Sequence, residues 1–290
     1  MRWAMSVAMV PPEELAELAQ LAESVGFDAV SLPDSVFYPE QVTGDYPFTP
    51  DGRRMWAPET PMPDPLVTIA ALAAVTDRIR FQPSVLKLPL REPLLLAKQV
   101  ASLAVLSGDR VSLGVGMSWI PEEFRFTGTE MRTRGARSDD AIEILRLICG
   151  GGPRWVEHHG THHDFDRLMV APAPVTPVPI LVGGHSDAAL RRAARLGDGW
   201  IAANVPYADL ERAIARLHVL RRDHGRDEED FAVWASPVGV TDVDGFRQLA
   251  AAGVTDVYLA PWRFFGHGLA DRATRLESVR RFADDVISRF

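Results

Sequence analysis

Residues 180–200 of the 290-residue chain read ILVGGHSDAALRRAARLGDGW. The apolar run Ile180–Val182 has the length and composition of a buried strand, and two glycines follow it before Ser186, a favourable N-cap residue. Apolar side chains then recur at helical spacing as far as Leu196, and a second apolar run begins at Trp200. The stretch therefore predicts a strand, a tight turn, a helix and the next strand, which is the repeating unit of a parallel α/β fold.

The same alternation of short apolar runs and longer helical stretches recurs along the chain. Eight strands are predicted, at Trp3–Ala8, Ala29–Leu32, Ile79–Val85, Val111–Val115, Pro179–Val182, Trp200–Ala203, Phe231–Val238 and Val257–Ala260. The helices are predicted from Pro11 to Val25, from Asp64 to Val75, and at Pro93–Leu106, Arg134–Ile148, Ser186–Leu196, Tyr207–His224, Asp244–Ala252 and Arg272–Phe290. Eight strand–helix units favour a closed (β/α)8 TIM barrel of one domain, residues 1–290, over a doubly wound sheet.

Two segments exceed what such a barrel needs. The loop Pro33–Pro63 follows the second strand, and a loop of that length in a compact domain is usually a lid or a wall of a site. Before the fifth strand, Arg154–His158 and Thr161–Phe165 flank Gly160 in the manner of a β-hairpin insertion. In a (β/α)8 barrel the chemistry is expected at the loops that leave the carboxyl ends of the strands.

Composition and charge argue against several classes of protein. A net charge of −8 and a pI of about 5.5 give no electrostatic support for binding nucleic acid or an anionic membrane. Cys149 is the only cysteine, so no intramolecular disulfide forms. No apolar run approaches the ~20 residues of a membrane span, and Pro11-Pro12 ends the apolar N-terminal run too early for a signal peptide. We therefore expect a cytoplasmic protein that acts on a small molecule.

The turn Gly183-Gly184-His185-Ser186 is the most informative motif. Glycines let the backbone approach a ligand closely, and the first N–H groups and the dipole of the following helix favour an anion there. These four residues therefore fit a phosphate cradle. An ordinary tight strand-to-helix turn would have the same sequence, and the motif alone leaves both interpretations open.

Residues 182–200 also resemble the signature of the luciferase-like monooxygenases, most closely their coenzyme F420-dependent actinobacterial branch. Further blocks agree in order along almost the whole chain: Gly26–Val30, Asp64–Leu66, Val85–Pro93, Leu106–Arg110, Gly114–Gly116, Glu122–Phe124 and Arg134–Arg146. Several blocks at the right intervals are much more specific than any one of them. The resemblance implies a barrel that holds a flavin or a deazaflavin.

The resemblance also assigns parts of the chain to that cofactor. It implies that the phosphate lies near Gly183–Ser186 and that the ring leans against a bulge after the third strand, where the Ser84–Val85 bond is expected to be cis. The acid that helps to bind the cofactor after the second strand maps onto Asp34. Three basic side chains near the expected mouth are candidates to meet the anionic tail of F420: Lys87, Arg91 and Arg263.

Two departures from the family pattern concern proton transfer. Many members carry a histidine after that acid, where this chain has Ser35, and some deazaflavin dehydrogenases have a carboxylate after the fourth strand, where it has Met117. No catalytic acid or base is therefore assigned. Four titratable residues remain as candidates: Lys87, His185, Glu122 and Glu123. A surface or supporting role is the alternative for each of them.

Histidines and tryptophans carry two further interpretations. The tract His158–His163 resembles a metal site, but no acid or cysteine at ligand spacing completes a shell, so we expect a solvated hairpin and no metal. Trp56 and Trp119 fall in loops at the expected mouth, and with Met117 they form the predicted substrate pocket. Trp200 lies in a strand and is expected in the core.

The leading functional hypothesis is a redox enzyme that moves a hydride between F420 and a small organic substrate, because a deazaflavin favours hydride transfer and handles oxygen poorly. An FMN-dependent monooxygenase is the alternative among enzymes. A barrel that binds the cofactor without turnover is a third possibility, since Ser35 and Met117 replace the usual proton-transfer groups. A homodimer is expected.

Overall fold

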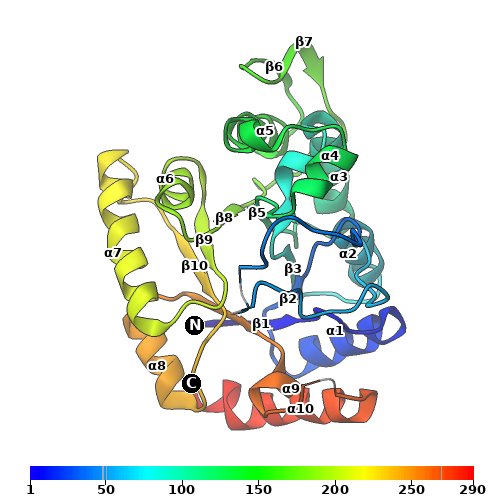
Figure 1. Ribbon diagram of the computed structural model, residues 1–290, viewed down its shortest axis with the longest axis vertical. Helices are drawn as coiled ribbons and strands as arrows, with labels where there is room; N and C mark the ends of the chain where they lie inside the picture. The colour runs from blue at the N-terminus through cyan, green and yellow to red at the C-terminus, as the bar shows by residue number, and fades with distance from the viewer. Residues whose placement is uncertain (48, 50, 269) are drawn as a thin grey trace.

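A computed structural model describes residues 1–47, 49, 51–268 and 270–290. In this part of the chain, nine parallel strands form a nearly closed barrel with helices around it (Figure 1). The barrel strands are β1 Arg2–Ser6, β2 Ala29–Leu32, β3 Arg80–Pro83, β4 Leu86–Lys87, β5 Leu113–Gly116, β8 Ile180–Gly183, β9 Gly199–Ala202, β10 Ala232–Ala235 and β11 Asp256–Leu259. The predicted (β/α)8 barrel is confirmed.

The helices alternate with these strands. They are α1 Leu15–Ser24, α2 Pro65–Ala73, α3 Pro93–Leu106, α4 Pro121–Phe126, α5 Arg134–Cys149, α6 Asp187–Leu196, α7 Tyr207–Asp223, α8 Val243–Ala251, α9 Pro261–Phe264 and α10 Arg272–Asp285. Single 3-10 turns lie at η1 Pro12–Glu14, η2 Leu88–Leu90, η3 Met131–Thr133 and η4 Ile287–Arg289. None of the helices in the described part of the chain has the length and apolar character that a bilayer span requires.

Local signals in the sequence account for several helix ends. The Asp64 side chain accepts the N–H groups of Leu66 and Val67 and caps α2, and Ser186 caps α6 in the same way. Gly26 follows α1 with φ +99°, in the left-handed region that glycine adopts without a steric penalty. These predicted caps are confirmed.

The third strand is not the continuous run Ile79–Val85 that the sequence predicts. It is divided into β3, which pairs with β2, and β4, which pairs with β5. The peptide bond Ser84–Val85 between the two halves is cis, as predicted. The strand therefore changes its hydrogen-bonding neighbour at the mouth of the barrel.

The barrel closes where β3 approaches the start of β5. The N–H of Phe81 donates to the carbonyl of Arg110 at 2.8 Å, and the carbonyl of Phe81 accepts the N–H of Ser112 at 3.0 Å. Two residues after Ser112, a Cβ on Gly114 of β5 would lie 2.1 Å from the carbonyl oxygen of Pro83. The close approach of the two strands therefore depends on a glycine at this position.

One strand and one helix end earlier in the structure than the sequence predicts. The strand predicted to end at Val238 ends at Ala235, because Pro237 has no N–H to continue a ladder. The last helix, predicted to reach Phe290, ends at Asp285 and is followed by η4. Two short helices at the mouth, α4 and α9, were predicted as loops; each begins at a proline in its first turn.

The hairpin predicted before the fifth strand is present and packs beside α5. Its strands are β6 Trp155–His159 and β7 Asp164–Met169, so the second one begins later than the predicted Thr161. The turn takes residues 160–163, closed by the N–H of Gly160 on the carbonyl of His163 at 2.9 Å. Of the predicted loop Pro33–Pro63, residues 48 and 50 lie outside the described part of the chain.

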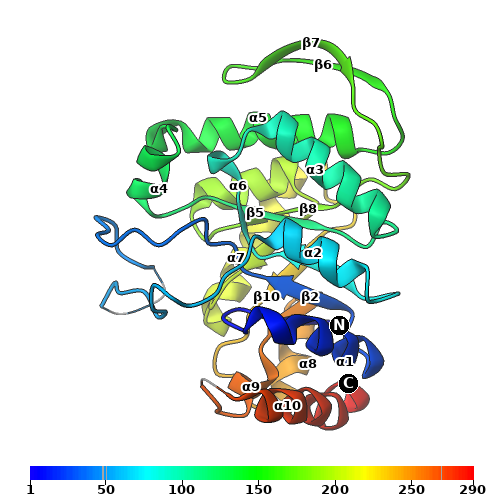
Figure 2. The ribbon, with the colours of Figure 1, turned by 90° about the vertical axis from the view of Figure 1, so that its right-hand side faces the viewer.

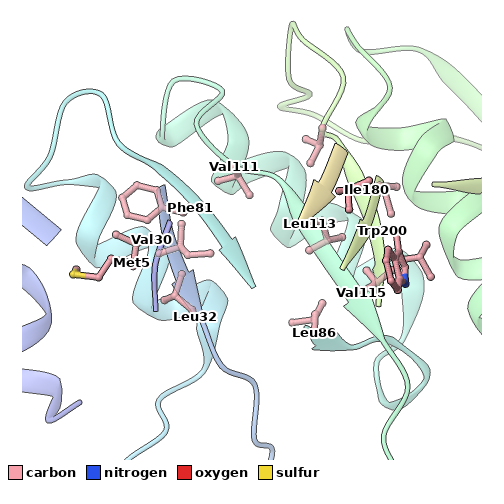
Figure 3. Close-up of a cluster of buried hydrophobic side chains, with 14 of the residues drawn as sticks. Met5, Val30, Leu32, Phe81, Leu86, Val111, Leu113, Val115, Ile180 and Trp200 are labelled. Atoms are coloured by element: carbon pink, nitrogen blue, oxygen red, sulfur yellow. The ribbon is translucent and has the colours of Figure 1, made fainter. Parts of the chain in front are cut away.

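The core has two layers because successive side chains of a strand point to opposite faces. Met5, Val30 and Phe81 face the helices and belong to a large buried cluster, part of which is drawn in Figure 3. The inward side chains form a second cluster that combines small residues on β1 and β2 with large ones across the barrel: Ala4, Ala29, Leu181, Ile201, Trp234 and Tyr258. Trp200 is fully buried in the outer layer, as predicted.

The mouth of the barrel can be located in Figure 2. The segment 33–64, α4 and α9 gather on one side, where the barrel strands have their carboxyl ends. The two chain termini lie toward the other end. The loops that leave the strands therefore lie at one end of the barrel, together with the long loop after β2.

Gly114→Ala tests how the barrel closes. The added methyl group meets the Pro83 carbonyl and, at 2.6 Å, the Cδ1 atom of Ile201, so we expect the free energy of unfolding to fall by about 1–3 kcal/mol. Urea denaturation followed by tryptophan fluorescence measures the change. Gly268→Ala is the control, because no described atom lies within 4 Å of its Cβ position. Equal stability of the two variants would contradict the prediction.

Candidate functional site at the mouth of the barrel

Asp34 follows β2, and its carboxylate is buried. Oδ2 accepts from Nη1 of Arg91 at 2.8 Å and from the backbone N–H of Lys87 at 2.7 Å, while Oδ1 accepts from Nη2 of Arg91 at 3.0 Å. Both oxygens are therefore engaged by the chain itself, and Asp34 fixes the end of β2 to β4. Its predicted part in cofactor binding stays a prediction.

Lys87 meets a carboxylate below the surface of the mouth. Its Nζ forms an ion pair with Oε1 of Glu123, and Oγ of Ser118 donates to Oε2 of the same carboxylate. All three residues are buried. Lys87 is therefore not a cation exposed to an anionic ligand, and Arg91 is likewise paired; of the three basic side chains proposed for the cofactor tail, Arg263 is the exposed one.

The cis segment lies against two glycines. A Cβ on Gly116 would lie 2.3 Å from Cγ2 of Val85, and one on Gly183 would lie 2.8 Å from Cγ1 of the same side chain. Val85 thus occupies the space that side chains at these strand ends would need, and it packs on the inner cluster of the barrel. The hydroxyl of Ser84 is buried and has no hydrogen-bond partner among the described residues.

The turn after β8 is held by hydrogen bonds from a β9 side chain and from the backbone just after β9. Nε1 of Trp200 donates to the carbonyl of Gly184 at 2.8 Å, and the N–H of Ala203 donates to Nε2 of His185 at 3.2 Å. Gly184 has φ +118°, so a larger residue would be strained there. Because Ser186 caps only one N–H of α6, other first-turn N–H groups have no partner inside the helix.

A small, open hollow lies beside this turn, between the ends of β5 and β8 and the helices α5 and α6. Glycines and a methionine line it from the strand ends: Gly116, Met117 and Gly183. Ser138 of α5 lines it with a buried hydroxyl that has no partner in the described part of the chain. Arg192 of α6 lines it too, held by the Asp139 carboxylate. The hollow therefore combines an unsatisfied hydroxyl and a guanidinium, which are donors for an anion.

Trp56 and Trp119 are brought together by a residue that the sequence reasoning did not single out. The ring of Tyr46 lies 5.2 Å from that of Trp56 and 5.5 Å from that of Trp119, measured between centroids. Burial raises the pKa of Tyr46, and Tyr46 is near enough to Tyr258 of the inner cluster to raise the pKa of that buried phenol further. The long loop therefore brings the rings of Tyr46 and Trp56 together with Trp119 of the loop after β5, whereas Met117 lines the hollow.

Glu122 fastens this loop to α4. Its Oε1 accepts the N–H and the hydroxyl of Thr43 at 3.2 and 2.9 Å. Burial alone raises the pKa of Glu122, but hydrogen bonds from its own backbone and from Thr43 outweigh it, so the pKa falls below its usual value. Glu122 and Glu123 thus hold two different walls of the site.

The histidine tract lies on the hairpin, away from the mouth (Figure 1). His158 is buried, whereas His159 is exposed and contacts Asp164 at 3.1 Å. The turn is attached to α5 by the carboxylate of Asp140, which accepts the N–H groups of residues 162 and 163 at 2.8 and 3.3 Å. In the described residues, no group of three or more potential metal ligands is assembled.

Comparisons with known proteins identify the family of the chain. The family model of the luciferase-like monooxygenases matches residues 2–244. The chain belongs to this family. The resemblance found in the sequence is therefore confirmed, and family membership indicates an oxidoreductase that uses a flavin or a deazaflavin.

Two relatives and two solved structures place the chain within the family. An uncharacterised protein of Mycobacterium tuberculosis is 41% identical over 292 residues, covering 100% of both chains. An F420-dependent glucose-6-phosphate dehydrogenase of Nakamurella multipartita is 30% identical over 193 residues, covering 66% of this chain and 52% of that protein. A monooxygenase from Streptomyces bottropensis has the same fold, with a TM-score of 0.76 and 21% identity over 100% of this chain and 99% of that one. So has a coenzyme F420-dependent tetrahydromethanopterin reductase from Methanopyrus kandleri, with a TM-score of 0.75, 16% identity and the same coverage.

His185 provides a test of the turn. Burial lowers its pKa from the ordinary value of 6.5, because desolvation disfavours the charged ring. The neutral ring can accept the backbone N–H of Ala203 at Nε2. Its stabilising contribution is therefore present above about pH 6.5 and is lost as the pH falls through the folded-state pKa. NMR titration, with the ring signal assigned by His185→Asn, should give a midpoint below 6.5. A midpoint at or above 6.5 would show that the ring does not accept this hydrogen bond.

Proposed function

We propose that the chain is an F420-dependent oxidoreductase that transfers a hydride between the deazaflavin and a small organic substrate. The observation that carries the proposal is the hollow beside the turn after β8, which is lined by the unpartnered Ser138 hydroxyl, the Arg192 guanidinium and Gly183, against which Val85 of the cis segment packs. The similarity to an F420-dependent dehydrogenase over two thirds of the chain supports the choice of cofactor.

The residues at the mouth fit a ring that carries a phosphate-linked tail. Ser84 and Val85 offer a buried hydroxyl and an apolar face, with Asp34 and Lys87 behind them. The turn residues Gly183, Gly184, His185 and Ser186 would hold the phosphate with their backbone N–H groups. Ser138 and Arg192, which complete the hollow, are added to this set.

When bound, the deazaflavin supplies a ring carbon that gives or takes a hydride. The chain's own residues orient the reactants and exclude water. The rings of Tyr46, Trp56 and Trp119 would cover the substrate. The ordinary pKa of 10.0 already keeps the Tyr46 hydroxyl protonated at neutral pH, and burial raises that pKa further. Lys87 and Glu123 neutralise one another, so neither is proposed as the acid or base.

An FMN-dependent monooxygenase is the second candidate. It is favoured by the fold, which matches a solved monooxygenase over the whole chain. The two cofactors differ in the anionic tail that FMN lacks. Lys87 and Arg91 are occupied by carboxylates, so the cation that we propose for the tail is the exposed Arg263. That the protein forms a homodimer stays a prediction.

Ser138→Ala tests the phosphate site without disturbing the free protein. The hydroxyl has no partner among the described residues, so its removal should leave the melting temperature unchanged. A hydrogen bond to a charged group contributes about 1.5–3 kcal/mol, so the affinity for F420 should fall roughly 10- to 100-fold by calorimetry. Ser102→Ala on α3 is the control, because Ser102 bonds only within its own helix.

The same titration compares F420 with FMN. We expect tighter binding of F420, weakened by salt and by Arg263→Ala, because exposed charge pairs are screened over ~8–10 Å at ordinary ionic strength. Tight FMN binding that is insensitive to salt, with no measurable F420 binding, would make the monooxygenase the better assignment. Binding of F420 without turnover of any substrate would favour a barrel that only carries the cofactor.

A further inference from the structure

Lys87 is held at both of its ends. Its backbone N–H donates to Oδ2 of Asp34 at 2.7 Å, and its Nζ forms an ion pair with Glu123. The side chain is 11% exposed and that of Glu123 is not exposed at all. A lysine fixed in this way between β2 and α4 determines where β4 runs.

The second oxygen of Glu123 extends the connection to the loop after β5. It accepts the hydroxyl of Ser118, and the Ser118 oxygen in turn accepts the N–H of Ile120 at 3.0 Å. Ser118 lies between the two loop residues predicted for the substrate pocket, Met117 and Trp119. One carboxylate therefore ties β4 to this loop.

The ion pair lies close to the cis segment, and this position connects it to the proposed cofactor site. Lys87 comes two residues after Val85, whose side chain rests on Gly116 at the end of β5. Val85 packs directly on Gly116, where β4 pairs with β5. The ion pair adds a second connection, which runs from Lys87 of β4 through Glu123 to Ser118 further along the loop 116–120. The placement of this loop relative to Val85 therefore depends on the pair.

We propose that Lys87 and Glu123 are a positioning pair, which fixes the loop that carries Met117 and Trp119 relative to the ring face at Val85. The pair acts through these residues and does not itself touch the reacting atoms. The inference rests on the proposed function only in that a flat ring binds here, and it applies to F420 and FMN alike.

The stability of the fold does not require such a pair. Two charges taken out of water are costly to desolvate, and well-packed apolar side chains of similar volume often replace a buried ion pair without loss of stability. Removal of one partner, by contrast, leaves an unpaired buried charge. The informative variant is therefore the double replacement Lys87→Met with Glu123→Leu, which removes both charges and keeps the volume.

We expect this double variant to melt within a few degrees of the wild type but to bind F420 at least tenfold more weakly by calorimetry. The matched control is the double variant Glu14→Leu with Arg275→Met, which removes an equally buried ion pair in the outer layer of helices. The control should bind the cofactor with wild-type affinity. Wild-type affinity in the Lys87/Glu123 variant would overturn the proposal.

Two further measurements keep the test decisive. Hydrogen exchange in the ligand-free protein should become faster at residues 84–88 and 116–120 in the double variant and stay unchanged in β9 and β10. Unchanged exchange at both segments would refute the pairing role.

If the double variant does not fold, Glu123→Gln provides the second test, because it retains the bonds to Ser118 without the charge. This variant should show the same loss of affinity, which Lys87→Arg should not. Failure of the wild type to bind F420 would overturn the proposed function alone, since the exchange measurement and titration with FMN still test the pair.

Discussion

The mouth of this barrel depends on the way in which the third strand shares its hydrogen bonds between two neighbours. β3 pairs with β2, and β4 pairs with β5, so the segment between them lacks a regular partner on either side. Buried N–H groups need acceptors, and here they find two different kinds. The N–H of Ser84 donates to the carbonyl of Leu32 at 2.8 Å, whereas that of Lys87 donates to the Asp34 side chain. A carboxylate thus takes the place of a strand carbonyl.

That carboxylate brings a charge into the wall of the site, and the other charges there follow from it. Arg91 neutralises Asp34 and reaches towards the Asp64 carboxylate, which caps α2. Lys87, the residue that Asp34 fixes, is neutralised by Glu123. Arg91 and Lys87, the cations on this side of the mouth, are therefore both paired with carboxylates of the chain itself. The phosphate proposed for the turn after β8 would therefore be held by backbone N–H groups, the Ser138 hydroxyl and the partly buried Arg192, while the exposed Arg263 is the salt-sensitive contact proposed for the tail.

Much of the fold could be predicted from the sequence because its signals are local. Apolar periodicity located the strands and helices, and capping residues such as Asp64 and Ser186 marked the helix ends. The turn after β8 was equally local, since its glycines and cap lie within four residues. The division of the third strand was missed because an apolar run does not reveal with which neighbour each residue pairs.

The parts of the site that were missed arise from contacts between distant residues. Lys87 and Glu123 are separated by 36 positions, and Ser138 has no motif around it. A signal for the pair was present all the same: Lys87 stands between Leu86 and Leu88 in an apolar run, and a buried lysine needs a partner. No such signal distinguishes Tyr46 from the other aromatic residues of its loop.

The two adjacent glutamates show how the walls of the site are linked to one another. On a helix, consecutive side chains point about 100° apart, so neighbours on the six-residue α4 reach different elements. Glu122 holds Thr43 of the long loop, whereas Glu123 holds Lys87 of β4. A shift of α4 therefore moves the aromatic cover and the ring face together. In the proposed site, a ligand that draws β4 towards α4 would therefore also act on the loop that carries Thr43.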